Sequence, residues 1–204
     1  MKEFEDSTLN KIYEEAKKEF LEKGFKTASL RNIVKSVGMT TGAFYGYYKS
    51  KEELFEALVN NQYIFLIESL TKTLHQINEC ALNGDVARIE KIVNDHFKNV
   101  LNYGYDNLIE FKLLLLCADG TKYENILDKL VDIQESCSNL YKDRLEKVSK
   151  LPNIDPKLEH VLVTGMFHTF SELFIHEMPL EKANNYIRDM ITFYMAGWNK
   201  ILSK

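Results

Sequence analysis

Residues 29–51 read SLRNIVKSVGMTTGAFYGYYKSK and predict two short helices joined by a tight turn. Apolar residues recur in the first half at the spacing of one buried helix face, and Ser29 is a candidate N-cap for that helix. Gly38 can adopt the left-handed conformation that ends a helix. Thr40 or Thr41 can cap the next helix, which we expect to be about two turns long. The pattern is typical of a helix-turn-helix, whose second helix enters the major groove of DNA.

The charge of this region also favours contact with nucleic acid. Between Lys23 and Lys51 the chain has six Lys and Arg side chains and no Asp or Glu. Residues 1–51 carry a net charge of +3, so the remaining residues carry −7 of the total of −4. This asymmetry fits a small DNA-facing module joined to a body with a different role.

Residues 12–59, IYEEAKKEFLEKGFKTASLRNIVKSVGMTTGAFYGYYKSKEELFEALV, resemble the N-terminal DNA-binding domain of the TetR family of bacterial transcriptional regulators. The resemblance includes Gly24-Phe25 at the end of the first helix, Gly42-Ala43-Phe44-Tyr45 in the recognition helix and the following run to Leu54. It covers about a quarter of the chain. It implies a ligand-responsive regulator, most simply a repressor, that binds a palindromic double-stranded operator as a homodimer and is released by a small, largely apolar or aromatic effector.

The resemblance also implies which side chains face DNA. They are Ser29, Arg31, Thr40, Thr41, Gly42, Tyr45, Tyr47, Lys49 and Lys51. Hydroxyl groups and aromatic faces can contact phosphates, base edges or thymine methyl groups, and lysine and arginine bind phosphates. The alternatives are that Tyr45 packs beneath the helix and that the lysines are only solvated. Gly46 departs from the family pattern, in which many members have a larger side chain.

The composition and the positions of helix-breaking residues predict an all-α fold of about nine helices. The chain is 45% hydrophobic and has only three prolines and nine glycines, which favours long helices. We expect a first helix over residues 8–24 and, beyond the helix-turn-helix, further helices over residues 50–81, 86–101, 106–118, 121–150, 155–177 and 180–202. Ser50 and Glu53 form a candidate capping box for the long helix at residue 50. Residues 1–49 are predicted to be the DNA-binding domain and residues 50–204 a helical effector-binding and dimerisation domain.

The body is expected, by the same resemblance, to hold an apolar effector cavity with a few polar groups. The candidate lining residues are Phe97, Tyr103, Tyr105, Phe111, Cys117, Tyr123, Met166, Phe167, His168 and Phe170. Each of them could equally be ordinary core. The last two helices are very rich in apolar residues and resemble the four-helix dimer interface of the family. The candidate interface residues are Val161, Phe174, Ile191, Tyr194, Met195 and Trp198.

Other kinds of site have weaker support in the sequence. His168, Glu172 and His176 share one helix side at i, i+4, i+8 spacing, which could suit a metal or a small all-α enzyme, but no zinc motif or catalytic constellation accompanies them. Cys80, Cys117 and Cys137 have no metal-ligand or disulfide spacing. We therefore expect no enzyme activity, no cofactor and no metal. Without a signal core or a membrane-length apolar run, we expect a cytoplasmic protein with no membrane partner. A DNA-binding protein without a small-molecule effector, responding to a protein partner or organising DNA, remains the alternative.

Overall fold

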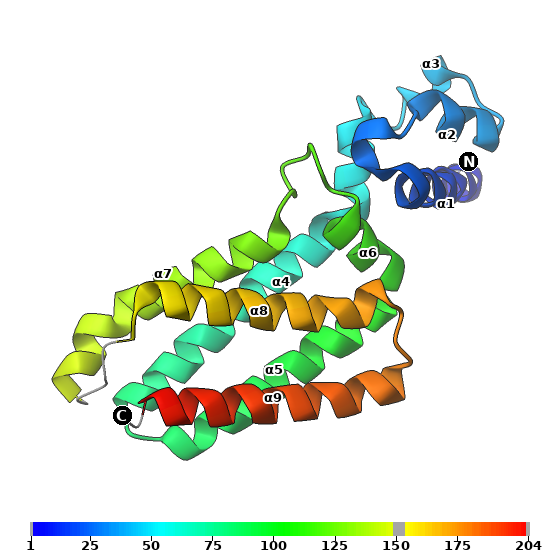
Figure 1. Ribbon diagram of the computed structural model, residues 1–204. Coiled ribbons are helices and arrows are strands. Elements are labelled where there is room, and N and C mark those ends of the chain that lie inside the picture. Colours follow the sequence, from blue (N-terminus) through cyan, green and yellow to red (C-terminus); the bar gives the residue numbers. More distant parts are fainter. Residues whose placement is uncertain (1, 149–153, 203–204) are drawn as a thin grey trace. The chain divides into compact units, whose positions relative to one another are not determined.

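The computed structural model describes residues 2–148 and 154–202 and is all-α, as predicted (Figure 1). Within those residues there are nine helices and no strand. The helices are α1 (Lys2–Thr27), α2 (Leu30–Val37), α3 (Thr41–Phe44), α4 (Lys51–Leu82), α5 (Val86–Asp106), α6 (Leu108–Leu116), α7 (Ile126–Val148), α8 (Pro156–Ile175) and α9 (Leu180–Leu202). None of these helices combines the length and the hydropathy needed to cross a lipid bilayer.

The chain forms two compact units. Unit 1 comprises Met1–Ile64 and Asn107–Ile126, and unit 2 comprises Phe65–Asp106 and Leu127–Lys204. Helix α4 contributes its first half to unit 1 and its second half to unit 2. The compact units thus divide the chain differently from the predicted domains, and the functional boundary at residue 49 stays a prediction.

Aromatic rings form the core of unit 1. The Phe20 and Phe55 rings meet edge to face at 5.1 Å, and Phe25 lies 5.2 Å from Phe55. Gly24, at a φ of 69°, kinks α1 where the sequence predicted its end, and the helix resumes to Thr27. Because only glycine adopts this φ at little cost, the kink is built into the sequence. It allows the Phe25 N–H to donate to the carbonyl of Cys117, at 2.9 Å.

A second aromatic cluster lies in unit 2. The centre of the Phe170 ring lies 5.0 Å from that of Phe97 and 5.4 Å from that of Phe174. The Tyr105 hydroxyl donates to the carbonyls of Leu173 and Met178 beside this cluster. The predicted helix break at residues 103–105 is wrong, because α5 continues to Asp106. Tertiary contacts of the tyrosines on either side of the buried Gly104 outweigh its low helix propensity.

The predicted helix start at residue 121 is also wrong. Turns occupy residues 121–125, and α7 begins at Ile126, directly after Asn125 in a positive-φ conformation at 58°. The Ser50–Glu53 cap is confirmed, since the Ser50 hydroxyl accepts from the Glu53 N–H at 3.1 Å and α4 begins at the next residue, Lys51. The Glu53 carboxylate accepts from the Lys49 N–H at 2.5 Å and completes the cap.

Candidate DNA-binding surface and ligand cavity

A carboxylate on α1 sets the position of α2. Glu19 Oε1 accepts hydrogen bonds from the Ser29 N–H at 2.9 Å, the Asn32 amide at 3.2 Å and the Lys23 ammonium at 3.0 Å. Partial burial opposes ionisation, but these hydrogen bonds outweigh it and lower the pKa of Glu19. The Ser29 hydroxyl makes no capping hydrogen bond, so the predicted side-chain cap is replaced by this contact to the Ser29 backbone. Sequence reasoning missed Glu19.

The turn between α2 and α3 has the glycine helix end and the threonine N-cap that the sequence predicted. Gly38 ends α2 at a φ of 76°, and its N–H donates to the Lys35 carbonyl at 3.0 Å. Thr40 is the N-cap of α3, because its hydroxyl accepts from the Ala43 N–H at 3.1 Å. Fully buried Phe44 anchors the segment in unit 1. The helix itself is a single turn, shorter than predicted, and is followed by a turn that reaches residue 47.

The predicted recognition residues lie on α3 and in the residues on either side of it. Tyr45 and Tyr47 are 54% and 37% exposed, Thr40 and Gly42 are exposed, and Thr41 is half-buried. This exposure favours contact with DNA over the alternative in which Tyr45 packs beneath the helix.

Two glycines in the segment have different steric surroundings. A Cβ at Gly42 would meet nothing closer than the Thr40 hydroxyl, at 3.9 Å. A Cβ at Gly46 would lie 3.2 Å from the Ala43 carbonyl oxygen, which is a tight contact. The departure from the family pattern at residue 46 therefore has a local reason, because the turn after α3 leaves little room for a side chain.

Three exposed cations belong to the adjoining segments, Arg31 and Lys35 to α2 and Lys49 to the residues between α3 and α4. Arg31, Lys35 and Lys49 have no ion pair in the described part of the chain. Lys23 is bound by Glu19, and Lys26 by Asp119 at 2.8 Å. Lys35 was not among the predicted DNA-binding residues, although its position four residues after Arg31 places both on one side of α2. The free cations are the ones that can bind phosphates.

Lys51 has a different environment from the other predicted cations. Its ammonium donates to the carbonyls of Phe25 at 2.6 Å, Ala28 at 3.0 Å and Lys26 at 3.4 Å. It also lies 4.4 Å from the centre of the Phe25 ring. Three carbonyls match the three donors of an ammonium group. Contact between Lys51 and phosphate therefore stays a prediction with no support from these contacts, which instead tie α4 to the end of α1.

Unit 2 contains a cavity of about 950 Å³ lined by α4, α5, α7, α8 and α9. Three of the predicted effector-binding residues, Phe97, Met166 and Phe167, line it. So do five residues predicted for the dimer interface, namely Val161, Ile191, Tyr194, Met195 and Trp198. The cavity wall is mainly apolar and aromatic, as is usual for small-molecule sites.

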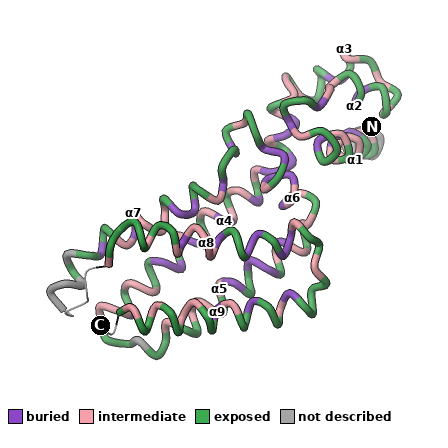
Figure 2. The backbone as a smooth tube through the Cα atoms, in the orientation of Figure 1, coloured by how far each residue is buried: buried purple, intermediate pink, exposed green. Residues whose placement is uncertain are grey.

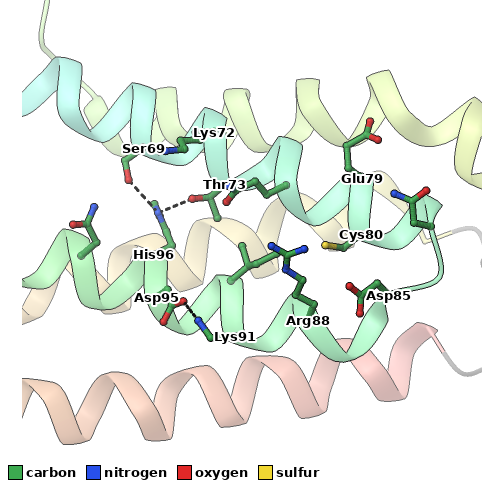
Figure 3. A pocket seen from close by; sticks show the side chains of 14 residues that line it. Ser69, Lys72, Thr73, Glu79, Cys80, Asp85, Arg88, Lys91, Asp95 and His96 are labelled. Carbon is green, nitrogen blue, oxygen red and sulfur yellow. Dashed lines mark hydrogen bonds and ion pairs between the residues drawn. The ribbon is translucent and has the colours of Figure 1, made fainter.

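His96, on α5, is a largely buried ionisable group of this wall, and it also lines the neighbouring groove drawn in Figure 3. It reaches from α5 to two hydroxyls of α4, with Nδ1 3.2 Å from the Ser69 Oγ and 3.0 Å from the Thr73 Oγ1. Burial lowers the pKa of His96 to about 4, so the imidazole is neutral at physiological pH. His96 and Thr73 also border a polar groove of about 540 Å³ between α4 and α5. Sequence reasoning missed this cluster. The only available signal was the pair of hydroxyl side chains, Ser69 and Thr73, four residues apart on α4.

Comparison with known proteins agrees with this geometry. Residues 12–58 match the model of the bacterial regulatory proteins of the tetR family, over the segment that builds α1 to α4 of unit 1. These residues form a TetR-family DNA-binding domain. In Bacillus subtilis, it is 32% identical to the HTH-type transcriptional regulator YuxN over 101 residues and 32% identical to YvdT over 143 residues. These matches cover 50% and 68% of this chain, and only 30% and 63% of the relatives' own lengths.

Solved TetR-family structures share the fold along nearly the whole chain. NalD of Pseudomonas aeruginosa, described as the secondary repressor of the MexAB-OprM multidrug efflux pump, superposes with a TM-score of 0.56 at 18% identity. That alignment covers 93% of this chain and 96% of NalD. PfmR of Thermus thermophilus gives a TM-score of 0.53 at 20% identity, covering 89% and 97% of the two chains.

The other predicted effector residues do not line the cavity. Tyr103 stacks on Phe65 at 3.8 Å, and Phe170 belongs to the aromatic core of unit 2. His168 is exposed on α8. Three further residues lie in the separate core of unit 1: Phe111, Cys117 and Tyr123. The Tyr123 hydroxyl donates to the Asn60 side chain at 2.8 Å, so these residues have structural roles in unit 1.

Exposed apolar side chains occur along α8 and α9. Val161 is 64% exposed and Phe193 is 74% exposed. Figure 2 shows that exposed and half-buried positions dominate α9. Phe174, predicted for the interface, is instead 1% exposed and belongs to the core of unit 2. Phe193 was not among the predicted interface residues.

The candidate metal residues are only partly brought together. His176 Nε2 lies 2.9 Å from Glu172 Oε2, and both side chains are exposed. His168 has no part in that pair. Across residues 2–148 and 154–202, no group of three His, Cys, Asp or Glu side chains is arranged to hold a metal ion.

Proposed function

We propose that this TetR-family regulator is a repressor that binds a palindromic operator as a homodimer and releases it when a small molecule fills the cavity of unit 2. The observation that carries the proposal is the exposed α3 surface. It presents Tyr45 and Tyr47, and the adjoining segments carry Arg31, Lys35 and Lys49, which have no ion pair in the described part of the chain. Hydroxyl and aromatic groups supply base contacts, and the cations supply phosphate contacts. Repression is proposed by likeness to the family and to relatives such as NalD, which is described as a repressor.

Dimerisation is supported by the surface of α8 and α9. Val161 and Phe193 are largely exposed, and Leu158 and Tyr186 are 45% and 44% exposed. The small Gly197 leaves open space around its Cα, which permits a close approach of another helix. Pairing the same two helices from two chains would bury these side chains in a four-helix, two-fold interface. Two recognition segments related by a two-fold axis require a palindromic site.

The cavity supports effector control over the alternative of a regulator without an effector. A filled core would have favoured that alternative, whereas unit 2 has room for a molecule of drug size. An effector can release DNA only if it binds more tightly to the conformation that does not match the operator. Helix α4 supplies part of the cavity wall and also belongs to the compact unit that carries α3, so it is the proposed connection.

Selection of genomic DNA fragments with the purified chain at near-physiological salt tests the proposal. Sequencing of the bound DNA is expected to show one enriched palindrome, and the neighbouring gene then suggests effectors to test for release. Uniform, salt-sensitive recovery of all fragments would mean that the basic surface binds only the DNA backbone, and the regulator proposed here would be refuted.

A further inference from the structure

The charged residues of the cavity wall come from α7 and α8. Glu135 and Lys142 lie on α7, and Lys157 and Glu159 lie near the start of α8. The wall supplied by α4 and α5 is apolar or uncharged, because His96 is neutral there. A ligand charge placed against that wall would lose its water without gaining a partner of opposite charge. The α4–α5 side of the cavity therefore selects uncharged groups.

His96 is suited to bind one polar group on that side. Its Nδ1 is occupied by the Ser69 and Thr73 hydroxyls, and its Nε2 has no hydrogen-bond partner in the described part of the protein. A neutral imidazole uses one nitrogen as a donor and the other as an acceptor. A ligand group that can donate and accept, such as a phenol hydroxyl, satisfies Nε2 in either tautomer.

We propose that the cavity binds uncharged, mainly aromatic molecules that carry one hydroxyl-like group, and that His96 Nε2 is the hydrogen-bond partner of that group. This proposal rests on the effector role of the cavity proposed above. Aromatic and sulfur-containing side chains from the opposite wall, among them Phe167, Trp198 and Met166, provide the stacking and adaptable contacts for the rings. His96 is thereby a specificity residue, and through Ser69 and Thr73 it joins the bound group to α4.

Asn78 offers a matched control within the same wall. It also lies on α4 and lines the cavity, but its amide donates to Cys137 Sγ at 3.4 Å. Replacing Asn78 with leucine removes a polar group of the wall without touching the His96 cluster. If any polar residue of the wall could bind the ligand hydroxyl, the two substitutions would act alike.

The charge part of the proposal is tested with two fluorescent probes that share one skeleton. N-phenyl-1-naphthylamine is neutral, and 1-anilinonaphthalene-8-sulfonate adds a sulfonate. We expect the neutral probe to bind the full chain at least tenfold more tightly, and Met166→Trp, which narrows the cavity, to weaken its binding. Equal or tighter binding of the sulfonate would overturn the selection of uncharged molecules.

The hydrogen-bond part is tested by displacing the neutral probe with 2-naphthol or with 2-methylnaphthalene, which has nearly the same shape. The measured quantity is the ratio of their dissociation constants. His96→Leu is expected to reduce the preference for 2-naphthol roughly fivefold, the scale of one neutral hydrogen bond, and Asn78→Leu to leave it unchanged. An unchanged preference in His96→Leu, or an equal loss in Asn78→Leu, would overturn the role of His96.

A measurement on the unsubstituted protein keeps the test decisive if His96→Leu does not fold. In ¹⁵N-labelled protein, 2-naphthol is expected to shift the His96 Nε2 resonance, and 2-methylnaphthalene to leave it in place. The resonance is assigned by its absence in His96→Gln. No shift with 2-naphthol bound would refute the contact. Failure of the proposed effector control looks different, because the probes would then bind as described but leave operator affinity unchanged.

Discussion

Replacing Lys51 with methionine separates two roles for this lysine. The substitution keeps a long apolar side chain and removes the ammonium that donates to the carbonyls of Phe25, Lys26 and Ala28. It leaves these carbonyls at the end of α1 without their donor and removes the cation from the Phe25 ring. Hydrogen bonds to a charged group contribute about 1.5–3 kcal/mol, so we expect a loss of about 2–3 kcal/mol in the free energy of unfolding. For a chain of this length, that corresponds to a fall of roughly 5–10 °C in Tm.

Thermal unfolding followed by circular dichroism measures this effect, and Lys49→Met is the matched control. Lys49 is exposed and its ammonium has no ion pair in the part of the chain described here. The Tm of the Lys49→Met variant should therefore differ little from that of the unsubstituted chain. The slope of operator affinity against salt is measured in the same variants. An unchanged Tm in Lys51→Met, together with a reduced salt slope, would show that the lysine binds phosphate and that its carbonyl contacts are unimportant.

Three further predictions concern the DNA surface, the dimer and the cavity. Arg31→Met and Lys49→Met should each lower the salt slope by about 1.8, which is about 0.9 for each of the two copies in a dimer, without lowering Tm, and unchanged slopes would remove them from the phosphate contacts. Phe193→Glu should convert a dimer to a monomer in analytical ultracentrifugation at micromolar concentration, because an exposed apolar side chain becomes a charge within the proposed interface; an intact dimer would place the interface elsewhere. Because the pKa of His96 is about 4 when folded and ordinarily 6.5, the unfolded chain binds the proton first as pH falls. Stability should therefore fall between pH 6.5 and 4 by up to about 3 kcal/mol, more steeply than in His96→Gln, and equal slopes would contradict the buried neutral state.

Local sequence patterns correctly predicted the helix ends that depend on hydrogen bonds between residues close together in the sequence. Gly38, Thr40 and the Ser50–Glu53 pair act at the helix ends as expected, because each uses backbone groups within a few residues. The same reasoning failed at Gly104, where α5 is continuous. There the contacts of neighbouring tyrosines with distant parts of unit 2 decide the outcome, and a single sequence does not contain those contacts in readable form.

In the candidate sites, too, some features can be predicted from local sequence and others depend on tertiary contacts. The exposed residues of α3 follow from helix periodicity and from the family resemblance, whereas the partner of each charged side chain depends on tertiary structure. Lys51 and Glu19 form contacts with residues about ten or more positions away, so neither role could be read from spacing. Likewise, the family resemblance predicted a cavity, but the sequence could not distinguish Phe167 in its wall from Phe111 in the other core.

The central claim is that the outer side of α3 reads a specific DNA sequence, and Gly42→Ala tests it most directly. The added methyl group meets only the Thr40 hydroxyl at 3.9 Å, so the fold should be kept, but it projects from the surface proposed to approach the bases. The measurement is the ratio of affinities for the selected palindrome and for a scrambled duplex of equal length and composition. We predict a ratio of at least about 10³ for the unsubstituted chain and a loss of most of it in Gly42→Ala, with binding to scrambled DNA unchanged. A ratio near one in the unsubstituted chain, or an undiminished ratio in the variant, would contradict the account.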